Sequence, residues 1–209
     1  MQHIRQKTAY LSRIRNGRVR LHQDPCRRCL VGLELSIEPG RVTDAKALSA
    51  IAQSTFELAC PVDSDKSEIA KYIAENLSEP QFKQMLLSDE TPVFCAWANS
   101  SIVGFLILGL SSPCPANPTL AHTTELKRLY VSPDFHGTGA ADLLIRAAFD
   151  ICHKHHRAGI WLSVFSGNLR AIRFYARSGF SKVGSTYFEM GNEMHLDDVM
   201  LATLLTTQE

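Results

Sequence analysis

The sequence of 209 residues has no long hydrophobic run. Its longest apolar stretch, residues 102–110, is nine residues long and includes two glycines, whereas a membrane-spanning helix needs about twenty apolar residues. The basic first residues are followed by neither an apolar segment nor a small-residue cleavage site, so they do not resemble a secretory signal. We therefore expect a cytoplasmic protein with no membrane partner.

Cysteine is scattered rather than patterned. The six cysteines do not have the spacing of a small secreted domain held together by disulfides. One close pair, Cys26 and Cys29, has His22 four residues upstream, but a closed zinc site needs four such ligands. We expect an exposed thiol pair and no metal, with a zinc site as the alternative.

A large net charge is also absent, because 22 Lys and Arg side chains face 21 Asp and Glu side chains, for a net charge of +1. That balance hides an asymmetry. Residues 1–32 carry eight basic side chains and one acidic one, a net charge of +7, while residues 33–209 carry 14 basic and 20 acidic ones, a net charge of −6. Apolar periodicity is sustained only from residue 33, so we predict a poorly ordered basic tail, 1–32, and one domain, 33–209. The tail has few aromatic residues to stack on bases, so no nucleic-acid partner is expected.

Hydrophobic periodicity predicts alternating strands and helices. Thr43 is expected to cap the first helix. The predicted order is strand 33–39, helices 43–56, 66–77 and one from 80, strands 93–98, 102–110 and 123–131, helix 140–151, strand 160–165, helix 168–178, and strands 180–190 and 198–204. This order predicts an α/β (α+β) fold, in which a mixed sheet has helices on both faces.

A glycine-containing turn, His136-Gly137-Thr138-Gly139-Ala140-Ala141, joins strand 123–131 to the most regular helix of the chain. The first N–H groups of a helix have no intrahelical partner and the helix dipole favours negative charge, so the turn predicts a phosphate site. The alternative is a turn that only packs tightly. No Gly-Lys-Ser/Thr follows it and the three-glycine dinucleotide fingerprint is not met, which excludes a P-loop and a dinucleotide-binding fold.

A second motif follows about thirty residues later, Asn168-x-x-Ala171-x-x-Phe174-Tyr175-x-x-x-Gly179-Phe180. Together with Leu129-Tyr130-Val131-Ser132-Pro133 and the glycine turn, it resembles the GNAT superfamily of acetyl-CoA-dependent N-acetyltransferases over about residues 35–204. Residues 188–193 with Asp198, and the helical region 67–87, are similar to bacterial polyamine (spermidine/spermine) acetyltransferases. The resemblance implies a mostly antiparallel central sheet of about seven strands with helices on both faces.

The resemblance implies an acetyl-CoA site on two segments. It assigns the main chain of Leu129, Tyr130 and Val131 to the pantetheine arm, with the Val131 amide polarising the thioester carbonyl. It assigns the diphosphate to the backbone of the turn, comprising Gly137, Thr138, Gly139, Ala140 and Ala141. His136 departs from the family pattern, which has Arg or Gln there. A protonated ring beside phosphate would make binding pH-dependent, and an exposed loop histidine is the alternative.

The helix from residue 168 completes the implied co-substrate site. Asn168 and Phe174 are assigned to the pantetheine arm, although Asn168 is equally well explained as a helix cap. Three arginines are candidates for the adenosine 3′-phosphate, with an exposed helix face as the alternative: Arg170, Arg173 and Arg177.

The resemblance also assigns two catalytic residues. Tyr175 matches the general acid that gives a proton to the departing thiolate, and core packing is the alternative. Glu125, eleven residues before His136, matches the base that takes a proton from the acceptor ammonium, and pairing with Lys127 or Arg128 is the alternative. The rival carboxylates, as bases or as cation binders, are Glu193, Asp197 and Asp198.

The predicted function is transfer of an acetyl group from acetyl-CoA to a primary amine by direct attack in a ternary complex. The charge of −6 suits a small cationic amine such as a polyamine, and equally a lysine side chain or a protein N-terminus. A non-catalytic CoA-binding regulatory module is a further alternative, and a homodimer is compatible with the sequence.

Overall fold

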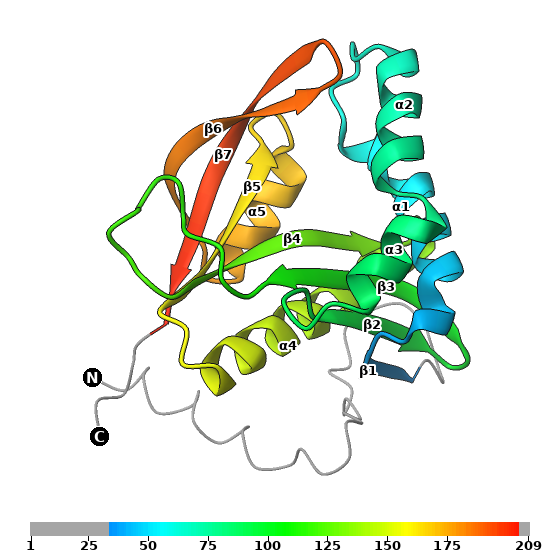
Figure 1. Ribbon diagram of the computed structural model, residues 1–209, viewed down its shortest axis with the longest axis horizontal. Helices are drawn as coiled ribbons and strands as arrows, with labels where there is room; N and C mark the ends of the chain where they lie inside the picture. The colour runs from blue at the N-terminus through cyan, green and yellow to red at the C-terminus, as the bar shows by residue number, and fades with distance from the viewer. Residues whose placement is uncertain (1–33, 205–209) are drawn as a thin grey trace.

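The computed structural model describes residues 34–204, and within them seven strands form one sheet in the order β1-β2-β3-β4-β5-β7-β6 (Figure 1). All neighbours are antiparallel except β4 and β5, so the predicted fold class is confirmed. The predicted tail and the Cys26–Cys29 pair lie outside the described residues. The strands are β1 (Leu35–Pro39), β2 (Val93–Ala98), β3 (Ser101–Gly109), β4 (Thr123–Val131), β5 (Gly159–Phe165), β6 (Ser181–Met190) and β7 (Glu193–Thr203).

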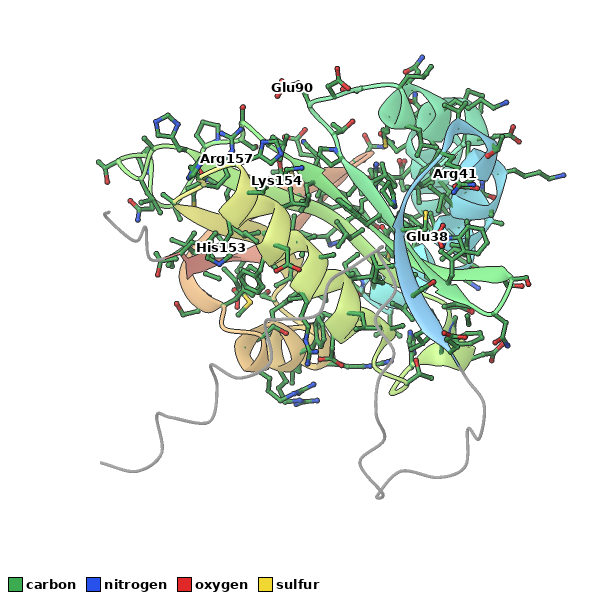
Figure 2. The ribbon with its side chains drawn as sticks, turned by 90° about the horizontal axis from the view of Figure 1, so that it is seen from below. Glu38, Arg41, Glu90, His153, Lys154 and Arg157 are labelled. Atoms are coloured by element: carbon green, nitrogen blue, oxygen red, sulfur yellow. The ribbon has the colours of Figure 1, made fainter. Side chains whose placement is uncertain are left out.

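Two helices, α4 (Ala140–Lys154) and α5 (Leu169–Arg177), cover one face of the sheet. α4 buries Leu143, Leu144 and Ala148, whose spacing of one and four residues puts them on one side of the helix. They pack against the central strands, where Leu106 and Leu162 are also buried. In Figure 2, α4 crosses in front of the sheet, and basic side chains gather at its C-terminal end: His153, Lys154 and Arg157.

Three helices cover the opposite face: α1 (Ala45–Phe56), α2 (Lys66–Asn76) and α3 (Glu79–Leu86). Asp65 caps α2, because its side chain accepts a hydrogen bond from the Ser67 amide at 2.7 Å. The Ser49 hydroxyl donates to the carbonyl of Leu77 at 2.7 Å and so ties α1 to the end of α2. These contacts fix the start of α2 and tie its C-terminal end to α1.

Most predicted boundaries differ from the observed ones by one to three residues, and two differences change how the chain is described. Thr43 does not cap α1, because a 3-10 turn (Val42–Asp44) comes first and the Asp44 carboxylate accepts from the Arg41 amide at 2.8 Å. β7 begins at Glu193 and not at residue 198, since a tight turn at Gly191, with φ of +60°, lets the chain pair back on β6 at once. The longer strand brings five additional residues into the sheet. No helix in the described part of the chain is both long and apolar enough to cross a membrane.

Candidate active site

The main cleft opens where β4 and β5 separate. These parallel strands pair only from Thr123 with Gly159 to Glu125 with Trp161. β4 then bulges, because its register against β3 shifts between Leu126 and Arg128. Beyond this point both strands continue without pairing to each other, and a cleft of about 1140 Å³ lies between the layers. We call its two parts the glycine-turn half and the aromatic half. The glycine-turn half is lined by residues of α5 and by His136, Gly137, Gly139, Ala141 and Asp142. The aromatic half is lined by Phe56, Cys60, Tyr72, Tyr130, Phe188, His195 and Asp197.

The glycine-turn half is built from main chain at the start of α4. Gly137 and Gly139 have φ of +79° and +94°, a region that residues other than glycine seldom adopt. The space that a Cβ would occupy at each of them is open. The Thr138 hydroxyl donates to the Phe135 carbonyl at 2.8 Å, and Ala140 is buried in the core. The side chains of Thr138 and Ala140 therefore do not line the cleft, and the expectation for these two residues concerns their main-chain amides alone.

His136 has a structural contact that the sequence does not predict. Its Nε2 lies 2.9 Å from the carbonyl oxygen of Val131, so the ring donates to the last residue of β4. Both residues line the cleft. His136 is thus an exposed loop residue whose side chain also joins the glycine turn to the strand end.

α5 supplies the outer wall of the glycine-turn half. The Asn168 side-chain oxygen accepts from the Ala171 amide at 3.1 Å, which confirms the helix cap. Asn168 also lines the cleft, as do Phe174 and the three arginines of this helix, Arg170, Arg173 and Arg177. The arginines give this half a positive wall beside the N-terminus of α4, which favours a polyanionic ligand.

Tyr175 lies on the same helix and faces the boundary between the halves. The centroid of its ring lies 5.3 Å from that of Phe174 and 5.8 Å from that of Phe180. Burial raises the pKa of the Tyr175 phenol above its usual value. A phenol with a raised pKa stays protonated at neutral pH, so Tyr175 can donate a proton.

Glu125 lines the cleft at the last position where β4 pairs with β5. Both of its polar contacts are to Oε2: the Ser112 hydroxyl donates at 2.9 Å and the Lys127 ammonium lies at 3.1 Å. The structure therefore shows the predicted ion pair with Lys127. Arg128 instead contacts the sulfur of Met85 and the carbonyl of Asn76, at 3.1 and 3.4 Å.

The rival carboxylates occupy three different environments. Asp198 does not line the cleft, since it pairs with Lys182 at 2.6 Å. Asp197 lines it and is only 7% exposed; burial raises its pKa although it is hydrogen-bonded to Ser163. Glu193 lies in an adjoining hollow and contacts His195.

Several residues of the aromatic half are not predicted from the sequence. Phe56 stacks on Tyr72 at 4.7 Å, and Tyr72 meets the edge of Phe188 at 5.4 Å. Burial together with Glu57 and Glu193 raises the pKa of the Cys60 thiol to about 11. The alternation Glu193-x-His195-x-Asp197 is the signal that could have identified the β7 residues, had the strand been extended back from residue 198.

Comparison with known proteins agrees with this geometry. The model of the acetyltransferase (GNAT) family matches residues 52–180. An uncharacterized N-acetyltransferase of Mycobacterium tuberculosis (strain H37Rv) is 34% identical over 164 residues, which covers 78% of this chain and all of the relative. The chain belongs to the acetyltransferase (GNAT) family.

Solved structures share the fold. The PaiA N-acetyltransferase of Thermoplasma acidophilum in complex with coenzyme A aligns with a TM-score of 0.69 at 20% identity, over 82% of this chain and 99% of the other. The ribosomal-protein-S18-alanine N-acetyltransferase of Escherichia coli aligns with a TM-score of 0.60 at 19% identity, over 84% and 97%.

As a member of this family, the protein is an acetyl-CoA-dependent N-acetyltransferase. Its own residues fit that co-substrate, because the positive-φ glycines leave the helix N-terminus open to phosphate and three arginines stand beside it. Acetyl-CoA supplies an activated thioester. In the described part of the chain, no group of three or more His, Cys, Asp or Glu side chains could hold a metal ion.

Proposed function

We propose that the protein acetylates the primary amine of a small cationic molecule such as a polyamine, by direct attack in a ternary complex. The observation that carries this proposal is the aromatic half, where the buried carboxylate of Asp197 shares a cleft with the rings of Phe56, Tyr72 and Phe188. Carboxylates and aromatic faces are the groups that attract ammonium ions.

The balance of charge supports a cationic acceptor. Residues 33–209 carry a net charge of −6, and Asp63 and Glu193 line the hollow beside the aromatic half. The cations on this side are held by the protein itself: Lys127 pairs with Glu125, and Arg128 donates to Met85 and Asn76. The charge of Lys127 is thus balanced by an ion pair, and the contacts of Arg128 fix the position of its guanidinium.

The roles proposed for the glycine-turn half follow the family pattern. The main chain of Leu129, Tyr130 and Val131 would pair with the pantetheine arm, since the β5 side of β4 is unpaired there. The amides of residues 137–141 would hold the diphosphate, with Asn168 and Phe174 along the arm. All of these residues lie in the proposed domain, 33–209. A cytoplasmic location and a homodimer stay predictions.

Proton transfers complete the proposed reaction. Tyr175 is the proposed acid for the leaving thiolate, and its raised pKa keeps it protonated until the thiolate forms. Glu125 is the base that the family pattern predicts. Cys60, the thiol that lines the cleft, has a pKa of about 11 and is protonated at neutral pH, which favours direct attack over a covalent enzyme intermediate.

A protein N-terminus is the second candidate acceptor. The observation that favours it is the shared fold with the S18-alanine N-acetyltransferase of Escherichia coli. Against it, α2 and the β6–β7 turn meet above the aromatic half. The Asp65 backbone N–H donates to the Glu193 carboxylate at 2.7 Å, and the Asn192 side-chain amide donates to the Glu68 carboxylate at 3.2 Å. This bridge leaves less room for a polypeptide than for a small amine.

The test is a panel of acceptors with acetyl-CoA, read as release of free thiol. The panel contains polyamines, amino acids, aminoglycosides, and peptides with free lysines or N-termini. We expect the highest kcat/KM with a polyamine. A preference for a peptide would establish the second candidate, and tight CoA binding without thiol release for any amine would favour a non-catalytic binding module.

A further inference from the structure

Three polar residues alternate along the start of β7: Glu193, His195 and Asp197. Residues two apart on a strand point to the same face, so all three side chains lie on the face opposite α5. The register pairs His195 with Phe188 and Asp197 with Phe165, and both aromatic residues line the cleft. The row therefore forms a polar edge to the aromatic half.

His195 stands at the junction of two spaces. A hollow of about 470 Å³ adjoins the cleft, and its lining includes Asp63, Ser64 and Glu193. Pro61, Phe165 and His195 line both the hollow and the cleft. His195 therefore lies between the acidic hollow and the cleft in which β4 and β5 separate.

The orientation of the ring is fixed by a chain of hydrogen bonds. His195 Nε2 lies 2.9 Å from Glu193 Oε2, and Glu193 Oε1 accepts the Asp65 amide at 2.7 Å. A carboxylate can only accept, so Nε2 carries the proton and the neutral ring keeps a lone pair on Nδ1. The ring is 15% exposed and meets the edge of Phe165 at 6.2 Å, which leaves it few other orientations.

We propose that His195 is the base that accepts the proton of the acceptor ammonium, with Glu193 as its positioning residue. This inference rests on the proposed function and replaces Glu125, whose Oε2 is already bound by Lys127 and Ser112. The other groups that face the row are Asp197 on β7, Ser163 on β5, and Cys60 and Asp63 on the segment after α1. The imidazolium that forms is therefore flanked by the carboxylates of Glu193 and Asp197.

The step is balanced as follows. An N–H bond of the ammonium breaks and its proton moves to Nδ1 of His195. The freed electron pair attacks the thioester carbonyl carbon, the C–S bond breaks, and the thiolate takes the proton of Tyr175. The proton that nitrogen loses as the amide forms returns to Tyr175 through solvent, and His195 releases its proton to solvent.

The experiment compares His195→Gln with the wild type and with Glu125→Gln as the matched control. Glutamine keeps an amide that can donate to Glu193 but cannot take up a proton. General bases contribute at least about 100-fold, so we expect kcat/KM for a polyamine to fall about 100-fold in His195→Gln and the acid limb of its pH profile to disappear. Glu125→Gln should retain that limb. Unchanged CoA affinity and Tm would show that His195→Gln is folded.

A second measurement separates chemistry from structure. An acceptor amine with a pKa of about 6 is already neutral at pH 7.5 and needs no base, so the defect of His195→Gln should shrink at least about tenfold with it. An equal defect with both amines, or a retained acid limb, would overturn the assignment. Loss of the limb in Glu125→Gln alone would give the role to Glu125. If the wild type acetylates no amine, both the proposed function and this role are wrong.

Discussion

The glycine-turn half of the cleft consists largely of main chain, whereas the aromatic half consists of side chains from segments far apart in the sequence. The first uses one turn, the helix start that follows it and α5, all within residues 136–177, with two glycines at positive φ. The second brings together Phe56, Tyr72, Phe188 and His195 from four elements. A backbone site binds a ligand that every family member shares, while a side-chain site can change with the acceptor. The predictions below test this division.

Tyr175 lies between the halves and should show the largest effect. Because Tyr175→Phe removes the proton for the thiolate without changing the ring, we expect kcat to fall about 100-fold, the low end for acid catalysis, since a thiolate is a fair leaving group. CoA affinity should not change. Tyr187→Phe, at a tyrosine that is 65% exposed on β6, is the matched control and should be silent. Equal turnover in Tyr175→Phe and the wild type would end the assignment.

Gly139→Ala tests the main-chain half. A side chain at φ of +94° costs about 1–3 kcal/mol, so the turn should rearrange and weaken CoA binding about tenfold or more. Gly179→Ala carries the same strain, with φ of +99° and equally open space, but outside the cleft. Both variants should lose Tm and only Gly139→Ala should lose CoA affinity by calorimetry. Equal affinities would show that the turn does not hold the ligand.

Asp197→Asn tests the aromatic half. Burial raises the folded-state pKa above the unfolded value of about 3.9, so the folded protein binds this proton more tightly. The free energy of unfolding therefore falls as pH rises through that window, and the wild type bears the full cost of the buried charge at neutral pH. We expect the variant to have a higher Tm than the wild type at pH 7 but not near pH 3. Its KM for a polyamine should rise about tenfold, because one ion pair with the substrate is lost. An unchanged KM would remove Asp197 from acceptor binding.

His136→Gln should have the smallest effect. Glutamine can still donate to the Val131 carbonyl, so the turn should keep its shape and the Kd of acetyl-CoA should change about threefold or less, within one hydrogen bond. The informative quantity is the slope of that Kd between pH 6 and 8. A slope equal to that of the wild type would assign His136 to structure alone, and a flatter slope would show that its charge contributes.

The glycine-turn half was largely predictable, because a strand, a glycine turn and an amphipathic helix are contiguous in the chain. The motif did not predict that the side chains of Thr138 and Ala140 lie outside the cleft, since it places a loop near a ligand but does not say which way each side chain points. The aromatic half was predictable only in part, because Asp197 and Tyr130 were candidates from the sequence and its other residues were not. Phe56 and Tyr72 satisfy a core pattern as well as a cleft wall, and His195 became visible only once β7 was extended to Glu193. Packing between distant elements decides such positions.

β4 and β5 are hydrogen-bonded over three residue pairs only, so the sheet is two blocks joined by a narrow seam. An extended ligand arm that pairs with the free edges of β4 and β5 would lie between them as an additional strand. It would connect β1–β4 with β5, β7 and β6. Ligands that bind only the folded chain stabilise it by mass action. Bound acetyl-CoA would thus stabilise the folded protein, and its resistance to unfolding in the cell would increase with the concentration of acetyl-CoA.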